Sequence, residues 1–216
     1  MQTHFEQELA ELKSTLLTMA SHAETAVTNA IKALVDHDDS LAQKVEESDE
    51  IIDQFEIEID EMAIHLLAKA PLASDLRLIT VAMKISQNLE RVGDEATKIA
   101  RRAQELNQEP QLKPYVDIPN MAKTALGMLK AALDSFVYRD PDSARQIIPR
   151  DTEVDLLNKQ LHRELASYMI EKPSTITRCL NLMVISKSLE RIADHATNVA
   201  EEVVYLCEAR DIRHGG

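Results

Sequence analysis

The sequence SQNLERVGDEATKIA at residues 86–100 recurs as SKSLERIADHATNVA at residues 186–200, at an offset of 100. Two earlier features, an Asp-x-x-x-Asp pair and a proline, recur at an offset of 102: residues 49–53 with 151–155, and Pro71 with Pro173. Several matching pairs in nearly one register indicate a tandem duplication of a unit of about 100 residues. The change of offset by two residues falls in a turn between helices, where changes of length are tolerated.

Each unit is composed mainly of residues that favour helices, and its apolar positions repeat every three or four residues. The motifs TxxE at residues 3–6 and SxxQ at residues 40–43 are capping boxes, which mark the first turn of a helix. Pro71 ends the second helix, because proline cannot continue it. In the first unit we expect helices at residues 3–35, 40–70 and 74–107.

A proline-rich linker separates the two units. Residues 109–119 contain three of the seven prolines of the chain, which identifies them as a break in regular structure. After the linker the second unit repeats the plan of the first. Asp140 and Pro141 have the order of an N-cap and a first helical residue, and we expect a kink at Pro149. Its helices are expected at residues 120–138, 141–170, and from the break at residues 173–174 to 209.

Three long antiparallel helices joined by short turns form a bundle. The sequence therefore predicts an all-α protein of two tandem three-helix bundles, with six long antiparallel helices in total. The expected domains are residues 1–108 and 120–216, joined by the linker at 109–119. The two bundles are expected to pack side by side.

Composition excludes several classes of function. The 24 Lys and Arg residues against 37 Asp and Glu give a formal net charge of −13, which argues against nucleic acid as a partner. Only four glycines are present, so a glycine-rich phosphate loop is absent. The N-terminus lacks the pattern of a signal peptide, and apolar runs fall far short of the roughly 18 residues of a membrane span. We expect a cytoplasmic protein that reaches a membrane only through partners.

Acidic pairs at i, i+4 spacing lie on the second and third helix of each unit. Such a pair occupies one face of a helix, where like charges repel. If the two helices are neighbours, the pairs meet on the surface of the bundle rather than in its core. A solvated acidic face is the simplest interpretation of one unit, but four pairs at matching places in two diverged halves favour a functional site. The eight residues are Asp49, Asp53, Glu90, Asp94, Asp151, Asp155, Glu190 and Asp194.

The functional interpretation of these pairs is a metal site on each bundle. Clustered carboxylates repel one another unless cations neutralise them. Their oxygens suit cations such as Mg, Ca, Mn or Fe, and four of them can hold more than one divalent ion. A structural zinc site of the Cys/His kind is disfavoured, because thiolates are absent from these faces and His162 is the only nearby imidazole.

Several polar residues flank the acidic pairs. Arg91 and Arg191 each follow the glutamate of a third-helix pair, and we expect each to form an ion pair with the aspartate three residues later. His195 is expected to be an ordinary surface residue. Asn198 and Glu201 continue the acidic face of the second unit, where the first unit has basic residues, so the two sites should differ.

Catalysis is not indicated. Carboxylate-bridged di-iron enzymes built on helical bundles use a Glu-x-x-His motif, and no histidine of the chain is preceded by glutamate at that spacing. No arrangement of Ser, His and Asp or of Cys and His stands out. We therefore expect a protein that is not an enzyme.

The motif LERVGD at residues 89–94, repeated as LERIAD at 189–194, resembles the PhoU family of phosphate-signalling regulators. The segment PLASDLR at residues 71–77 resembles the turn before the third helix in that family, and the similarity extends over nearly the whole chain. In the second unit Ala193 stands in place of the glycine at position 93, and PSTITR at 173–178 keeps the arginine of the turn but lacks its aspartate.

This resemblance implies a fold of two tandem three-helix bundles that often dimerise. It also implies a role as negative regulator of the phosphate regulon and of phosphate uptake. Members bridge the phosphate ABC transporter, through its ATPase subunit, to a membrane sensor histidine kinase, and they are cytoplasmic or peripheral to the membrane. Some carry multinuclear iron or other metal clusters on E(D)-x-x-x-D motifs, which here match the eight carboxylates. The metal that the resemblance implies is iron, in a multinuclear cluster, with Mg, Mn, Ca or Zn as alternatives.

Two other functions remain open at this point. The same carboxylates could serve a metal storage or redox protein, although the missing Glu-x-x-His motif argues against it. The acidic surface could also belong to a purely structural bundle, in which case divalent ions should not change its thermal stability.

Overall fold

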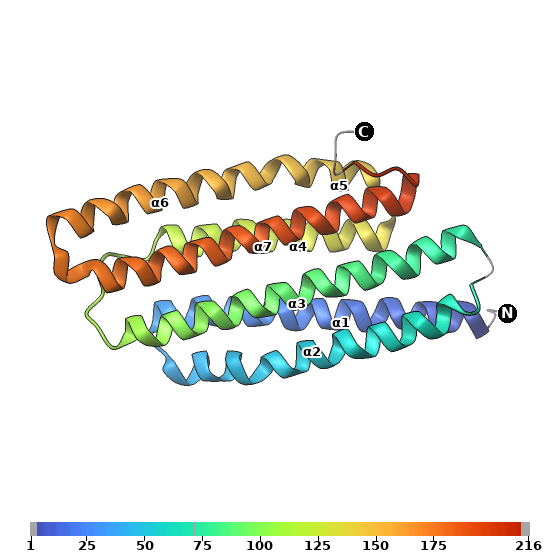
Figure 1. Cartoon of the computed structure of the whole chain (residues 1–216), viewed down its shortest axis with the longest axis horizontal. Helices are drawn as coiled ribbons and strands as arrows, with labels where there is room; N and C mark the ends of the chain where they lie inside the picture. The colour runs from blue at the N-terminus through green and yellow to red at the C-terminus, as the bar shows by residue number, and fades with distance from the viewer. Residues whose placement is uncertain (1–3, 71, 213–216) are drawn as a thin grey trace.

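The computed structural model describes residues 4–70 and 72–212, and within these residues it contains helices and no strand. Two bundles of three helical rods lie side by side, and the rods run nearly parallel to the long axis of the molecule (Figure 1). This confirms the expected fold class. The helices are α1 (His4–Asp36), α2 (Asp39–Leu67), α3 (Ala73–Asn107), α4 (Asp117–Tyr138), α5 (Pro141–Ile147), α6 (Asp151–Glu171) and α7 (Ile176–Glu208).

The rod that corresponds to α2 in the second repeat is interrupted by a turn. It consists of α5, a 3₁₀ turn at Ile148–Arg150 and α6. The turn contains Pro149, which lacks the amide that an α-helix needs at that place. Asp140 caps α5 by accepting hydrogen bonds from the amides of Asp142 and Ser143. This N-cap confirms the prediction, and at Pro149, where we expected a kink, a 3₁₀ turn interrupts the α-helix.

The two repeats bury equivalent positions. Every buried side chain of α4 lies 102 residues after a buried side chain of α1. The series begins at Ile118, the counterpart of Leu16, and ends at Phe136, the counterpart of Leu34. Only α1 continues further toward its N-terminus, where Leu12 is also fully buried. In the second repeat the non-helical segment 108–116 takes the place of these first turns.

Two helix starts differ from the predictions. The N-cap of α2 is Asp38, whose carboxylate accepts the amide of Leu41 at 3.0 Å, rather than Ser40. Helix α4 begins at Asp117, inside the predicted linker, because Pro119 fits the first turn of a helix, where its missing amide is not needed. The predicted capping box at Thr3 and the break at Pro71 lie outside the described residues.

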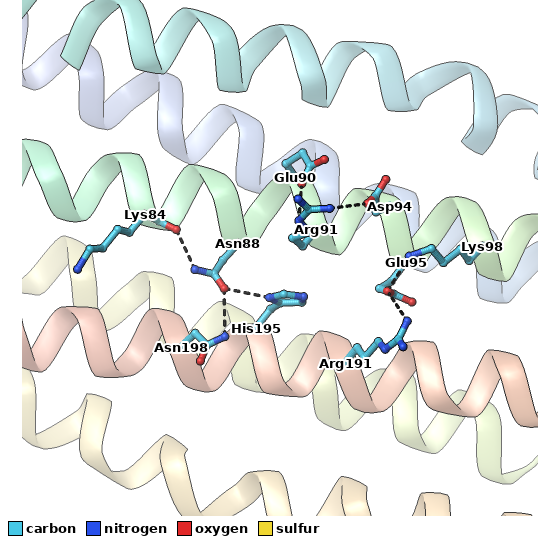
Figure 2. A network of polar contacts seen from close by, with 10 residues as sticks. All are labelled: Lys84, Asn88, Glu90, Arg91, Asp94, Glu95, Lys98, Arg191, His195 and Asn198. Carbon is cyan, nitrogen blue, oxygen red and sulfur yellow. Dashed lines mark hydrogen bonds and ion pairs between the residues drawn. The ribbon is translucent and has the colours of Figure 1, made fainter. Parts of the chain in front are cut away.

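A polar seam joins the two bundles where α3 and α7 pack antiparallel (Figures 1 and 2). The side-chain oxygen of Asn88 lies 2.9 Å from Nδ1 of His195. Glu95 accepts Arg191 across the seam at 3.2 Å and Lys98 from its own helix at 2.9 Å. Since hydrogen bonds and ion pairs need specific geometry, these contacts fix the register of one bundle against the other.

The seam has an approximate two-fold symmetry. His195 is the counterpart of Glu95 in the repeat, and Ser188 is the counterpart of Asn88. His195 of the second repeat contacts Asn88 of the first. The symmetry-related contact is between Glu95 of the first repeat and Ser188 of the second, and Ser188 donates a hydrogen bond to Glu95. Burial alone would raise the pKa of Glu95, but the hydrogen bonds of Ser188 and Lys98 and the nearby positive charges lower it overall. Burial also lowers the pKa of His195.

None of the helices in the part of the chain that the structure describes is long and apolar enough to cross a membrane.

Candidate metal centre

In the first repeat α2 and α3 are neighbours, and their acidic faces meet as the sequence predicts. Partial burial, followed by the charges of Asp53 and Asp94, raises the pKa of Asp49. Asp53 lies on the same helix one turn away, whereas Asp94 lies on the neighbouring helix. Because charges perturb one another mainly over a few ångströms, the two acidic pairs form one electrostatic cluster.

Glu56 extends this cluster. Burial and the charge of Asp94 raise the pKa of Glu90, and Glu56 and Asp53 of α2 add to the rise. An open hollow of about 410 Å³ lies beside Glu56 and Glu90, bordered also by Arg91. Glu56 is not among the eight predicted site residues, although its spacing of seven residues from Asp49 places it on the same face of α2.

The second repeat brings its four carboxylates together on α6 and α7. Burial, and then the charges of Glu190 and Asp151, raise the pKa of Asp194 to about 6. Burial, Asp155 and Glu190 likewise raise the pKa of Asp151. Glu190 is only 8% exposed, so this member of the predicted surface site is buried.

Basic side chains are distributed differently around the two acidic clusters. In the second repeat Lys187 forms an ion pair with Glu190, and Lys159 lies 3.5 Å from Asp155. The counterparts of these lysines in the first repeat are Gln87 and Ile57. The counterpart of Glu56 is Asn158, a buried residue that is hydrogen-bonded by Ser186. The second cluster is therefore less negative than the first.

The two arginines that follow the glutamates have different partners. Arg91 contacts Glu90 at 3.2 Å and Asp94 at 3.3 Å (Figure 2). The contact with Asp94 is the one that the sequence predicts. The prediction for Arg191 is wrong. Its guanidinium points across the seam to Glu95 instead of to Asp194, because the buried carboxylate of Glu95 offers a stronger site in lower dielectric. Asn198 likewise faces the seam, where it donates to Asn88.

Gly93 lets α2 approach α3 closely at the first cluster. A Cβ atom at this position would lie 2.9 Å from Cδ1 of Ile52 and 3.3 Å from Oδ1 of Asp49. In the second repeat the counterparts are Ala193 and Val154. The extra methyl on one helix is thus matched by a missing methyl on the other, which keeps the packing of the two helices equivalent.

We expect the effect of Gly93→Ala to depend on Ile52. Alone it should lower the free energy of unfolding by about 1 kcal/mol, because the cost of overpacking exceeds the gain in helix propensity. In an Ile52→Val background the same change should raise it by up to about 1 kcal/mol, since the clash is relieved and the propensity gain remains. Urea denaturation of the four proteins of this double-mutant cycle measures the coupling. Equal effects of Gly93→Ala in both backgrounds would contradict the close approach.

The donor set of both clusters suits hard or borderline cations. Oδ1 of Asp60 and Oδ1 of Asp151 are buried carboxylate oxygens that accept no hydrogen bond within the described residues, and a cation could coordinate them. Within residues 4–70 and 72–212, however, no three side chains of His, Cys, Asp or Glu are grouped closely enough to hold a metal ion. The helices thus bring the predicted residues near one another, whereas ligation by three of them requires side-chain rotation.

Together the fold and these clusters define a class: a duplicated helical bundle with a carboxylate-rich face on each repeat and no recognisable catalytic constellation among the residues described. The profile of the PhoU domain matches residues 16–103 and 118–203, one segment in each bundle. The chain belongs to the PhoU family, which confirms the resemblance seen in the sequence.

Relatives match over nearly the full length. The chain is 44% identical to the phosphate-specific transport system accessory protein PhoU homolog of Pseudomonas aeruginosa, over 98% of this chain and 88% of that protein. It is 35% identical to the phosphate-specific transport system accessory protein PhoU of Escherichia coli, with the same coverage. The crystal structure of PhoU from Pseudomonas aeruginosa superposes with a TM-score of 0.92, at 43% identity, covering 96% of this chain and all of that one. The PhoU structure from Streptococcus pneumoniae gives 0.91 at 29% identity, covering 97% of this chain and 99% of that one.

Proposed function

We propose that this protein is an accessory and regulatory protein of phosphate transport. The observation that supports this most is family membership along both repeats, together with relatives that are named for the phosphate-specific transport system. The rigid seam between the bundles supports a role as a connector, since it holds two different surfaces in a fixed arrangement.

The proposal extends to the direction of regulation. The protein acts as a negative regulator of the phosphate regulon and of phosphate uptake, without enzymatic activity. It does so by contacting the ATPase subunit of the phosphate ABC transporter and the sensor histidine kinase of the regulon. Unequal repeats support two distinct partners, because the acidic clusters differ in charge, in burial and in neighbouring lysines. We also propose that the protein is a homodimer and is located in the cytoplasm.

Metal binding by the two clusters is part of the proposal. In the first repeat Asp49, Asp53, Glu90 and Asp94 would hold the ions, and in the second Asp151, Asp155, Glu190 and Asp194 would do so. The ion would neutralise carboxylates that now repel one another, as their raised pKa values indicate. Iron, in a multinuclear cluster, is the first candidate, and Mg, Mn, Ca or Zn are the alternatives. The hollow beside Glu56 and Glu90 leaves room for water that a hydrated cation keeps.

Co-purification tests the partner proposal. A tagged copy of the full chain, expressed at its natural level, should recover both the transporter ATPase and the histidine kinase from membranes solubilised in mild detergent. A tagged copy with all eight carboxylates changed to Asn or Gln separates the role of the clusters from that of the remaining surface. Recovery of neither partner by the unmodified chain would contradict the proposal.

A further inference from the structure

Two adjoining hollows run along the first repeat, on the side of α2 that faces away from the acidic cluster and toward α1. The first has a volume of about 380 Å³ and the second about 190 Å³, and both are bordered by Glu58. We call them together the α1/α2 groove. Its lining consists of Glu47, Glu50, Ile51, Gln54, Phe55, Glu58, Met62, His65 and Leu66 of α2, with Glu8 and Glu11 of α1.

The floor of the groove is apolar. Ile51 is 45% exposed, although it lies on a helix whose other faces are already occupied by the core and the acidic cluster. Phe55 is half-buried, and its ring lies 5.4 Å from the ring of His22 on α1. Met62 continues the same stripe toward the end of α2, where it is also half-buried. Apolar side chains at steps of four and seven residues form the kind of surface that receives another helix.

The rim of the groove is acidic. Of its five glutamates, Glu8 contacts Lys69 at 2.8 Å and lies 3.8 Å from His65. In the described part of the chain, no ion pair involves Glu11, Glu50 or Glu58. An apolar floor beneath a row of carboxylates is complementary to a partner with an apolar stripe flanked by positive charges.

The second repeat carries a positive charge at the equivalent place. Lys113 is the counterpart of Glu11. Its side chain is only 10% exposed and contacts Glu164 at 2.6 Å and Asp117 at 2.8 Å. Glu164 is itself the counterpart of Met62. On either side of the lysine, Leu112 and Tyr115 pack against the core.

Each repeat covers this position with its own chain, the first with the first turns of α1 and the second with segment 108–116. The second repeat has a lysine flanked by apolar residues there, whereas the first has Glu11, so a positive charge at this place in the first repeat would come from another molecule.

We propose that the α1/α2 groove binds a cationic amphipathic helix of a partner protein. The groove is parallel to α1 and α2 and extends from Glu47 to Leu66, which is about 30 Å at 1.5 Å per residue and fits a helix of about 20 residues. An anionic membrane surface is excluded as the occupant, because the carboxylates of the rim would repel it. This inference uses only the groove and its counterpart, and it does not depend on the proposed role in phosphate transport.

A labelled peptide tests this inference. The probe is a helix-forming peptide of about 20 residues, with leucines on one face and lysines on both flanks. Its binding to the full-length chain is followed by fluorescence anisotropy. We expect saturable binding that weakens strongly between about 50 mM and about 500 mM salt. A second peptide with glutamate in place of every lysine should not bind.

Two variants locate the site. The triple change Glu11→Gln, Glu50→Gln and Glu58→Gln should weaken binding about tenfold, since each charge contributes a modest amount. Ile51→Asn keeps every carboxylate and should also weaken binding several-fold, because it removes apolar area. The matched control neutralises three exposed glutamates elsewhere, Glu109, Glu153 and Glu171. It changes the net charge equally and should leave the affinity within about twofold.

Three results would overturn the proposal. Equal binding of the glutamate peptide would remove the argument from charge, and equal weakening by the control would show that net charge alone attracts the peptide. Self-association in analytical ultracentrifugation that Ile51→Asn abolishes would assign the groove to a second copy of this chain.

Discussion

Replacement of Asp194 by asparagine is expected to stabilise the metal-free protein at neutral pH. The pKa of this carboxyl rises from 3.8 to about 6 in the folded state, mainly by burial and then by the charges of Glu190 and Asp151. About two pKa units correspond to nearly 3 kcal/mol, and screening at a partly exposed group reduces this to about 1–2 kcal/mol. The folded protein therefore bears an energetic cost for ionising Asp194, which the variant removes.

The sign of the pH dependence follows from linkage. A carboxyl whose pKa is raised on folding destabilises the protein above its folded pKa, and this penalty disappears as the pH falls from about 6 toward 3.8. The stability gain of Asp194→Asn should therefore be full at about pH 7.5 and small at about pH 4.5. Urea denaturation in the presence of a chelator measures both values.

The counterpart in the first repeat provides the control. Asp94 has an arginine partner at 3.3 Å, so Asp94→Asn removes an attraction as well as a repulsion and should give no comparable gain. A gain of Asp194→Asn that is equally large at about pH 4.5 would contradict the electrostatic explanation.

Divalent cations are expected to raise the melting temperature, and this is the larger of the two effects. A ligand at 100 times its dissociation constant stabilises the folded state by about 2.7 kcal/mol per site. For a chain of 216 residues, each kcal/mol corresponds to roughly 2–4 °C. Two filled sites should therefore raise the melting temperature by roughly 10–20 °C. Titrations with Mg, Mn, Ca, Zn and anaerobic ferrous iron, followed by thermal denaturation, would identify the preferred ion.

Variants of the carboxylates assign this effect to the two clusters. Asp49→Asn, Asp53→Asn, Glu90→Gln and Asp94→Asn together should remove about half of the shift, and the eightfold variant should remove all of it. Elemental analysis of the purified proteins should show the same proportions. A shift that survives in the eightfold variant would place metal binding elsewhere, and the absence of any shift would leave the acidic faces as docking surfaces.

The fold could be predicted from the sequence because its determinants are local and repeated. Apolar periodicity gave the helices, proline and aspartate marked several of their ends, and the duplicated LERxxD segments related the two bundles. Helix starts were less accurate, since Asp38 and Ser40 are both good caps and only the structure shows which amide is bonded. The start of α4 was missed because three prolines suggested a longer break, although one of them fits a first helical turn.

The site was predicted in part. Spacing placed the eight carboxylates on two helix pairs, but it did not reveal that Glu190 is buried or that Glu56 reaches Glu90. Arg191 and His195 were misjudged for one reason: both face the seam between the bundles, and the packing of α3 against α7 cannot be derived from periodicity within either helix. A close match of small and large residues, such as Gly93 with Ile52, likewise becomes apparent only when the partner helix is known.

Expression of a phosphate-starvation reporter in phosphate-rich medium tests the proposed function most directly. In a strain without the gene for this chain the reporter should be expressed despite abundant phosphate, and a copy of the unmodified gene should restore repression. The eightfold carboxylate variant, confirmed as folded by its circular dichroism, should restore it poorly. Continued repression in the strain without the gene would contradict the role as a negative regulator of the phosphate regulon.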